Sequence, residues 1–224
     1  MFAPETEILG IFPTPLYFTT WKDVNLSTIN FLDNVVMNED HCDTGKGIFG
    51  TKSIDTYVLD NVECEPLANF IMHHINQFAK NTLSLIYEEM HFTQSWVSTK
   101  KPGQKHTYHT HPNSIVSGAF YWQEGPIEPI GFEKQRSPNN LELLRNFDNR
   151  NDFACDYYYV TPRQYTLILF PSYLSHGVDP NSQNESRKSL AFNTMASGSL
   201  GSEENLTALD LNRLINKRQA GRLL

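Results

Sequence analysis

The sequence is poor in three features that would each indicate a class of protein: cysteine, clustered positive charge and long apolar runs. Its three cysteines, Cys42, Cys64 and Cys155, are odd in number and far apart, which predicts reduced thiols in a cytoplasmic protein and neither a disulfide framework nor a zinc knuckle. Lys and Arg number 18 against 25 Asp and Glu, and no basic block stands out, so no nucleic-acid binding is expected. No run approaches the roughly 18 to 20 apolar residues of a membrane span, and no signal peptide is evident, so no membrane partner is expected.

The composition instead predicts one folded domain over residues 1–224. Of the 224 residues, 39% are hydrophobic and 12% aromatic, which is enough for a single sizeable core. A helix is predicted over residues 65–81, because Leu67, Ile71 and Ile75 recur at helical spacing and Pro66 suits a first helical turn.

The second half of the chain has the pattern of an antiparallel β protein. Short β-rich runs cover residues 92–99, 115–122, 129–133, 156–160, 165–170 and 187–193, and turn-forming residues separate most of them. Together with the helix they predict an α+β fold built on a sandwich or barrel.

Three further segments are less regular. The opening segment, broken by Pro13 and Pro15, suits an edge strand. A polar insertion at residues 135–153 reads equally well as a solvated loop or as an active-site lid. The tail, residues 202–224, carries spaced leucines and is predicted to be a helix, which would pack on the sheet or on a second copy in a homodimer.

His109 and His111 form the first candidate metal-binding motif. Residues i and i+2 of a strand point to the same face, so the two imidazoles can aim at one point while Thr110 faces away. A His-x-His pair alone is weak support for a metal site. His106 lies three residues earlier, on the opposite face of an ideal strand, and is therefore left out of the predicted ligand set.

His176 and Arg187 form the second candidate motif. A hydrophobic strand ends at Pro171, a short loop leads to His176, and another strand begins at Arg187. Sequential strands usually lie side by side, so we expect Arg187 beside His176 at one rim of the sheet. Ser189, two residues on, faces the same side as Arg187.

This set of side chains favours iron with an α-keto acid. Imidazole with oxygen donors suits iron, and no thiolate cluster competes. An α-keto acid chelates Fe(II) through its carboxylate and keto oxygen, and its distal carboxylate then needs a fixed cation. The planar fork of Arg187 can meet that carboxylate with two hydrogen bonds.

The same motifs resemble the 2-oxoglutarate/Fe(II) dioxygenase superfamily, whose pattern is His-x-Asp/Glu, a distal His, and an Arg on the next strand. More narrowly, FPTPLY, HTHPNSIVSGAFYW, LFPSYLSHGVDPN and RKSLAFN resemble an oxygenase family of marine bacteria and their phages. The resemblance spans residues 12–193, with the core motifs at about 92–193. It implies a double-stranded β-helix (jelly roll) with supporting helices. It also implies a hydroxylase that couples oxidative decarboxylation of 2-oxoglutarate by O2 to hydroxylation of a small molecule or protein side chain.

The resemblance also assigns roles to individual residues. It makes His109 the first iron ligand and His176 the distal one. Arg187 with Ser189 would hold the far carboxylate of 2-oxoglutarate. Tyr121 would offer its phenol to the same carboxylate, and Ser117, four residues earlier, would face the same side.

One position departs from the superfamily pattern. His111 stands where the superfamily has a carboxylate, which leaves three alternatives for the third ligand. Three histidines could bind the iron, Glu133 could supply the carboxylate from a neighbouring strand, or water could fill the position.

Two rival functions stay open at this stage. A cupin-like metalloenzyme without 2-oxoglutarate would use the same histidines but would not need Arg187 and Ser189. A non-enzymatic phage jelly roll, acting as a binding or structural module, would not consume 2-oxoglutarate.

Overall fold

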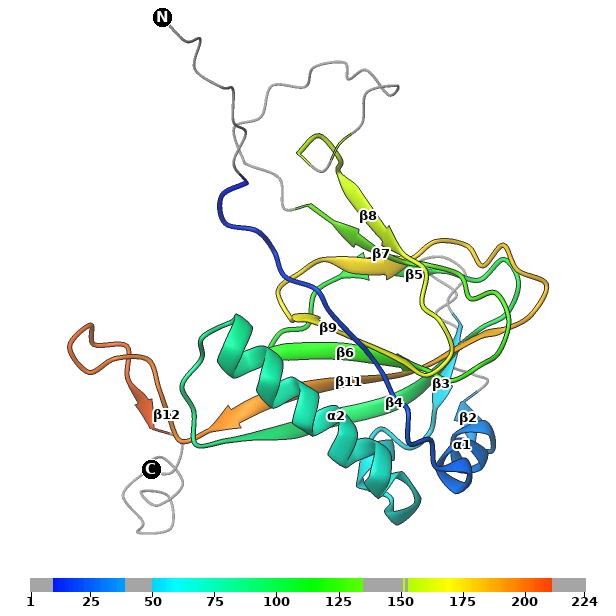
Figure 1. Cartoon of the computed structure of the whole chain (residues 1–224), viewed down its shortest axis with the longest axis horizontal. Coiled ribbons are helices and arrows are strands. Elements are labelled where there is room, and N and C mark those ends of the chain that lie inside the picture. The colour runs from blue at the N-terminus through cyan, green and yellow to red at the C-terminus, as the bar shows by residue number, and fades with distance from the viewer. Residues whose placement is uncertain (1–9, 39–49, 135–150, 152, 211–224) are drawn as a thin grey trace, which may run out of the picture.

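Two antiparallel sheets face each other in the computed structural model, which describes residues 10–38, 50–134, 151 and 153–210. The larger sheet has the order β1 (Tyr17–Thr20), β9 (Thr166–Pro171), β6 (Val116–Tyr121), β11 (Arg187–Ser197), β4 (Glu89–Lys100), β3 (Thr51–Ser53) and β2 (Met37–Asn38). The smaller has the order β5 (His106–His109), β10 (His176–Val178), β7 (Ile130–Glu133) and β8 (Tyr157–Val160). Figure 1 shows the smaller sheet above the larger one.

Helices cover the outer face of the seven-stranded sheet. They are α1 (Leu26–Asp33), the short 3-10 turns η1 (Val58–Asp60) and η2 (Val62–Cys64), and α2 (Glu65–Gln77), which runs on into the π-helix η3 (Phe78–Thr82). Leu67, Ile71 and Ile75 of α2 are fully buried in the cluster that contains Phe120 and Phe192 of the sheet. Figure 1 shows α2 lying across β6, β11 and β4. The inner face of this sheet is therefore left for the second sheet and for the site between them.

Packing of α2 on the sheet should carry much of the stability. We expect Ile71→Ala to lower the free energy of unfolding by about 2 to 5 kcal/mol, because it opens a cavity in a fully buried contact. Urea denaturation measures this change. Ile86→Ala is the matched control, since Ile86 is 96% exposed and its truncation should change stability by less than about 0.5 kcal/mol. Equal effects of the two substitutions would contradict this account of the core.

Most of the predicted elements are confirmed. All six β-rich runs contain strands, α2 and η3 cover the predicted helix, and β1 lies at an edge of its sheet. The predicted insertion lies outside the described residues, apart from 151 and 153.

The predicted helical tail is wrong where the structure describes it. Ser199–Leu200 (β12) pairs with Leu209–Asp210 (β13), and the chain between them forms turns. Leu206 is 93% exposed and adopts a positive φ of 56°, so its place in a helical spacing is not used for packing. Residues 211–224 lie outside the described part of the chain.

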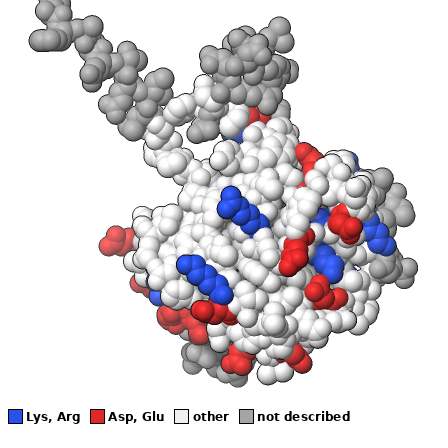
Figure 2. All heavy atoms as spheres, turned by 45° about the vertical axis from the view of Figure 1, so that its right-hand side comes forward, with Lys and Arg blue, Asp and Glu red and all other residues white. Residues whose placement is uncertain are grey.

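The surface agrees with the charge pattern of the sequence. On the face drawn in Figure 2, acidic and basic side chains are interspersed over a mainly uncharged surface. Among the described residues, no helix is both long enough and apolar enough to cross a membrane.

Candidate active site

Three histidines converge between the two sheets. His109 ends β5 and pairs with His176 at the start of β10. His111 follows two residues after the strand, where its backbone N–H donates to the carbonyl of Ser172 at 2.9 Å. The ring centroids lie 4.5 Å apart for His109 and His176 and 4.9 Å apart for His111 and His176. The nitrogens of all three rings that could bind a metal lie within 4.8 Å of one another.

The hydrogen bonds of the His109 and His176 rings leave Nε2 of each ring free to bind a metal. Nδ1 of His109 lies 2.8 Å from the carbonyl of Thr107, and Nδ1 of His176 lies 3.0 Å from the carbonyl of Leu174. A ring that donates Nδ1–H to a carbonyl presents Nε2 as its lone-pair nitrogen, as metal-binding histidines do. Nε2 of His111 and Nε2 of His176 are 3.2 Å apart. Two imidazoles bound at right angles at the zinc-like distance of 2.0 to 2.1 Å would place these atoms about 3 Å apart. The residues therefore fit a metal ion.

Burial keeps two of the rings in the metal-binding form. Burial, with a smaller contribution from the charge on His109, lowers the pKa of His111 to about 4 and that of His176 to about 3. Since neutral imidazole is the form that ligates metals, these two rings are available near neutral pH.

Glu133 is not brought to this cluster. Its carboxylate accepts hydrogen bonds from Tyr157 Oη at 3.2 Å and Ser175 Oγ at 3.1 Å. It lines a separate cavity beside the N-terminal segment and β8. Within the described residues, the metal-binding cluster consists of His109, His111 and His176 alone.

Arg187 is a buried cation that lines the same space as the three histidines. Its side chain donates from Nε to the carbonyl of Glu128 at 3.0 Å, from Nη2 to Tyr121 Oη at 2.8 Å and from Nη1 to Ser189 Oγ at 3.3 Å. Arg187 is 4% exposed, and no ion pair of the described residues includes it. A guanidinium has five N–H donors, so about two remain for a ligand.

Tyr121 is held ready to donate as well. It is fully buried, and burial raises the pKa of its phenol, so the hydroxyl stays protonated. Its oxygen accepts from Arg187, which leaves its own O–H for a second acceptor. A buried Arg and Tyr arranged in this way suit a carboxylate.

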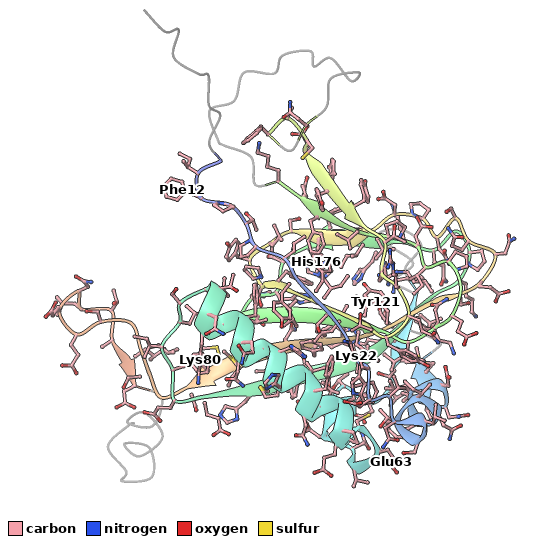
Figure 3. The ribbon with its side chains drawn as sticks, viewed as in Figure 1. Phe12, Lys22, Glu63, Lys80, Tyr121 and His176 are labelled. Atoms are coloured by element: carbon pink, nitrogen blue, oxygen red, sulfur yellow. The ribbon has the colours of Figure 1, made fainter. Side chains whose placement is uncertain are left out.

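One small cavity connects the cation to the histidines. Its volume is about 50 Å³, and its lining includes Arg187, Tyr121 and Ser189 together with the three clustered histidines. Ile130, Phe170 and Val178, all buried, form apolar walls. Figure 3 shows His176 and Tyr121 in the space between the sheets.

The structure brings Arg187 near His176, and His111 near His109, by other routes than the sequence analysis assumed. Arg187 does not lie beside His176 in one sheet, because β11 pairs with β4 and β6 while β10 pairs with β5 and β7. The two residues line one cavity because the sheets face each other. Likewise, His111 lies past the end of β5, so the turn after the strand, and not strand alternation, brings it to His109.

Ser117 is not brought to Arg187. Its hydroxyl hydrogen-bonds with Ser172 Oγ at 2.7 Å and with Asn193 Oδ1 at 2.8 Å. It does face the same side of β6 as Tyr121, but four residues of strand separate the two by roughly 13 Å. The expected contact of Ser117 with the same carboxylate therefore has no support in the geometry.

Sequence reasoning missed two residues of the site. His106 lines the same cavity, and its ring centroid lies 4.5 Å from that of His109. An irregular register opposite β10 removes the strict alternation that had placed His106 on the other face. Lys100 was also missed. Alternation along β4 would have found it, since Trp96, Ser98 and Lys100 all line a second, larger cavity.

Residues 94–193 match the model of a family described as "Putative 2OG-Fe(II) oxygenase". This segment is similar to that family over its whole matched length. The match confirms the predicted resemblance to the superfamily, and with it the predicted Fe(II), 2-oxoglutarate and O2. The matched segment contains His109, His111, His176, Tyr121 and Arg187, so the clustered histidines and the buried Arg–Tyr pair both lie inside it. The match supports an oxygenase-type enzyme.

Solved structures of the superfamily share the fold. A prolyl-4-hydroxylase from Pseudomonas putida superposes with a TM-score of 0.52 at 14% identity, covering 83% of this chain and 94% of that one. HygX from Streptomyces hygroscopicus, with nickel, 2-oxoglutarate and hygromycin B bound, gives 0.55 at 11% identity, covering 82% and 83%. The epimerase SnoN from nogalamycin biosynthesis gives 0.54 at 12% identity, covering 79% and 72%.

These likenesses confirm the predicted jelly-roll fold. No curated protein matches the chain. The comparisons give no support to the predicted link with phages.

Proposed function

We propose that the chain is a 2-oxoglutarate-dependent dioxygenase that hydroxylates its prime substrate, with Fe(II) held by His109, His111 and His176. The observation that carries the proposal is the single cavity joining these three histidines to a buried arginine, which has no carboxylate partner among the described residues. A cupin-like enzyme without a keto acid would gain nothing from burying Arg187 there. A structural module would gain nothing from either group.

The chain's own residues would bind and orient the co-substrate. Arg187, Tyr121 and Ser189 bind the distal carboxylate of 2-oxoglutarate, which fixes the molecule along the cavity toward the histidines. The carbonyls of Thr107 and Leu174 hold two imidazoles in the ligating tautomer. Ile130, Phe170 and Val178 exclude water from the keto acid. Bound iron would supply the activation of O2, for which no side chain offers a substitute.

Three neutral ligands would change the electrostatics of the site. The superfamily's usual pair of histidines with one carboxylate brings one negative charge that this cluster lacks. The bound metal would then be more positive by one charge, which favours the dianion 2-oxoglutarate as the co-substrate.

The direct test is consumption of 2-oxoglutarate. The purified protein with Fe(II), ascorbate and O2 should form succinate even without a prime substrate, and Arg187→Ala should suppress this uncoupled turnover. A protein that leaves 2-oxoglutarate untouched but binds iron would favour the cupin-like alternative. One that binds neither would favour the non-enzymatic module.

The third ligand can be tested by iron content. We expect His111→Ala to lose stoichiometric iron and Glu133→Ala to retain it, because Glu133 is engaged with Tyr157 and Ser175 away from the cluster. Metal analysis after anaerobic reconstitution and desalting gives the comparison. Loss of iron in the Glu133 variant alone would instead assign the third position to that carboxylate.

Hydroxylation itself can be separated from other oxidative outcomes. Structural relatives of the chain include a prolyl hydroxylase, an epimerase and a carbocyclase. We expect a product heavier than its substrate by one oxygen atom, labelled when ¹⁸O₂ is supplied. A product of unchanged mass would point to epimerisation.

A further inference from the structure

A second cavity opens beside the histidine cluster. Its volume is about 420 Å³, and it lies against β3 and β4. His109 and His111 line it as well as the smaller cavity, so a molecule bound here would reach the metal-binding nitrogens. This makes it the natural place for a prime substrate once 2-oxoglutarate occupies the smaller cavity.

Two lysines give this cavity its charge. Lys100 and Lys52 both line it, and the described lining residues include no Asp or Glu. Lys100 is 4% exposed, and its Nζ donates to Ser98 Oγ at 2.7 Å. No ion pair among the described residues includes either lysine. A buried ammonium with one hydroxyl partner and no anion is costly unless a ligand completes it.

Lys100 serves a different cavity from Arg187. The two residues are direct partners across β4 and β11, yet Arg187 lines only the small cavity and Lys100 only the large one. Burial, with a smaller contribution from repulsion by Arg187, lowers the pKa of Lys100 to about 8, so the ammonium form still predominates at neutral pH. One bound 2-oxoglutarate would pair its distal carboxylate with Arg187. Lys100 would then need a second anion as its partner.

We propose that Lys100, with Lys52 nearer the surface, binds an anionic group of the prime substrate, which is an organic carboxylate or phosphate. This inference rests on the proposed function, because it assumes that 2-oxoglutarate fills the Arg187 end. Trp96 lines the same cavity, with its ring centroid 6.2 Å from that of His111. An aromatic or alkyl body could pack on this ring while its anion meets Lys100.

The test uses protein loaded with Mn(II), which does not support turnover, and saturated with 2-oxoglutarate. Phenylacetate, phenyl phosphate and the neutral phenylacetamide are then titrated by calorimetry. At least one of the two anions should bind about tenfold or more tightly than the amide, as expected for one charge-assisted contact. Whichever anion binds better identifies the chemical class.

Substitutions test which residue causes the preference for the anion. Lys100→Met should remove the preference for the anion, Lys100→Arg should keep part of it, and Lys52→Met should weaken it. Lys101→Met is the matched control, because it removes the same charge from the neighbouring exposed position, and it should change nothing. Lys100→Met should change the 2-oxoglutarate affinity much less than it changes the anion affinity, because Arg187 and Tyr121 remain in place. Circular dichroism like that of the native protein would show that the variant is folded.

Two results would overturn the inference while leaving the proposed function in place. One is native protein that binds 2-oxoglutarate but shows no preference for either anion. The other is a Lys100→Met variant that loses 2-oxoglutarate affinity and keeps the anion preference, which would make Lys100 part of the co-substrate site. Failure of the Mn(II) protein to bind 2-oxoglutarate at all would instead refute the proposed function, and this inference with it.

Discussion

Replacing His176 by alanine is expected to abolish stoichiometric iron binding and uncoupled 2-oxoglutarate turnover, and His109→Ala should do the same. Each substitution removes one of three nitrogens that converge on one point. The two that remain cannot hold Fe(II) against desalting, since imidazole is a ligand of moderate affinity for this metal. Iron content per chain and succinate formation are the measurements.

The fold should survive these substitutions. His91→Ala is the matched control, because His91 lies on β4 with its side chain about half exposed, away from the cluster. It should retain full iron and activity. Unchanged circular dichroism in all three variants would separate loss of a ligand from unfolding. Full iron content in either His109→Ala or His176→Ala would remove that residue from the ligand set.

The sequence predicted the parts of this site that depend on local pattern. Short β-rich runs separated by turn residues located the strands that carry Tyr121, Arg187 and Ser189. Apolar spacing of three and four located the helix that covers the outer face of the sheet. These features are set by neighbours in the chain, so a single sequence contains them.

The features of the site that depend on strand pairing were harder to predict from the sequence. Arg187 meets the histidines across two facing sheets, and a rule about sequential strands placed it beside His176 instead. His106 turns toward the cavity through a register irregularity that no residue type signals. The buried Lys100 lies opposite Arg187 only because β4, about ninety positions earlier in the chain, pairs with β11. Such long-range pairings are decided by the packing of the whole sandwich.

The C-terminal tail also shows that a local pattern alone does not determine the structure. Its leucines have helical spacing, yet spacing stabilises a helix only when a surface is available to bury the stripe. In the described part, Leu206 is exposed and the chain turns back into the β12–β13 hairpin.

Arg187→Ala is expected to weaken 2-oxoglutarate binding far more than it weakens iron binding. Charge-assisted hydrogen bonds of this kind contribute roughly 1.5 to 3 kcal/mol, or about tenfold to more than a hundredfold in affinity. The loss of affinity should lie toward the upper end of this range. Arg187 is only 4% exposed, so water cannot freely replace the lost donors. Calorimetric titration of the Mn(II) protein with 2-oxoglutarate measures the change.

Neighbouring substitutions make this result specific to the guanidinium. Tyr121→Phe should cost about tenfold or less, since it removes one neutral donor and leaves Arg187 in place. Lys188→Ala is the charge-matched control: Lys188 is the next residue along β11, but it points outward to Asp33 at 2.8 Å, so its loss should leave 2-oxoglutarate affinity unchanged. If Arg187→Ala bound 2-oxoglutarate as tightly as the native protein, the distal carboxylate would have to be bound elsewhere. The buried Lys100, its partner across β4 and β11, would then be the nearest remaining cation to examine.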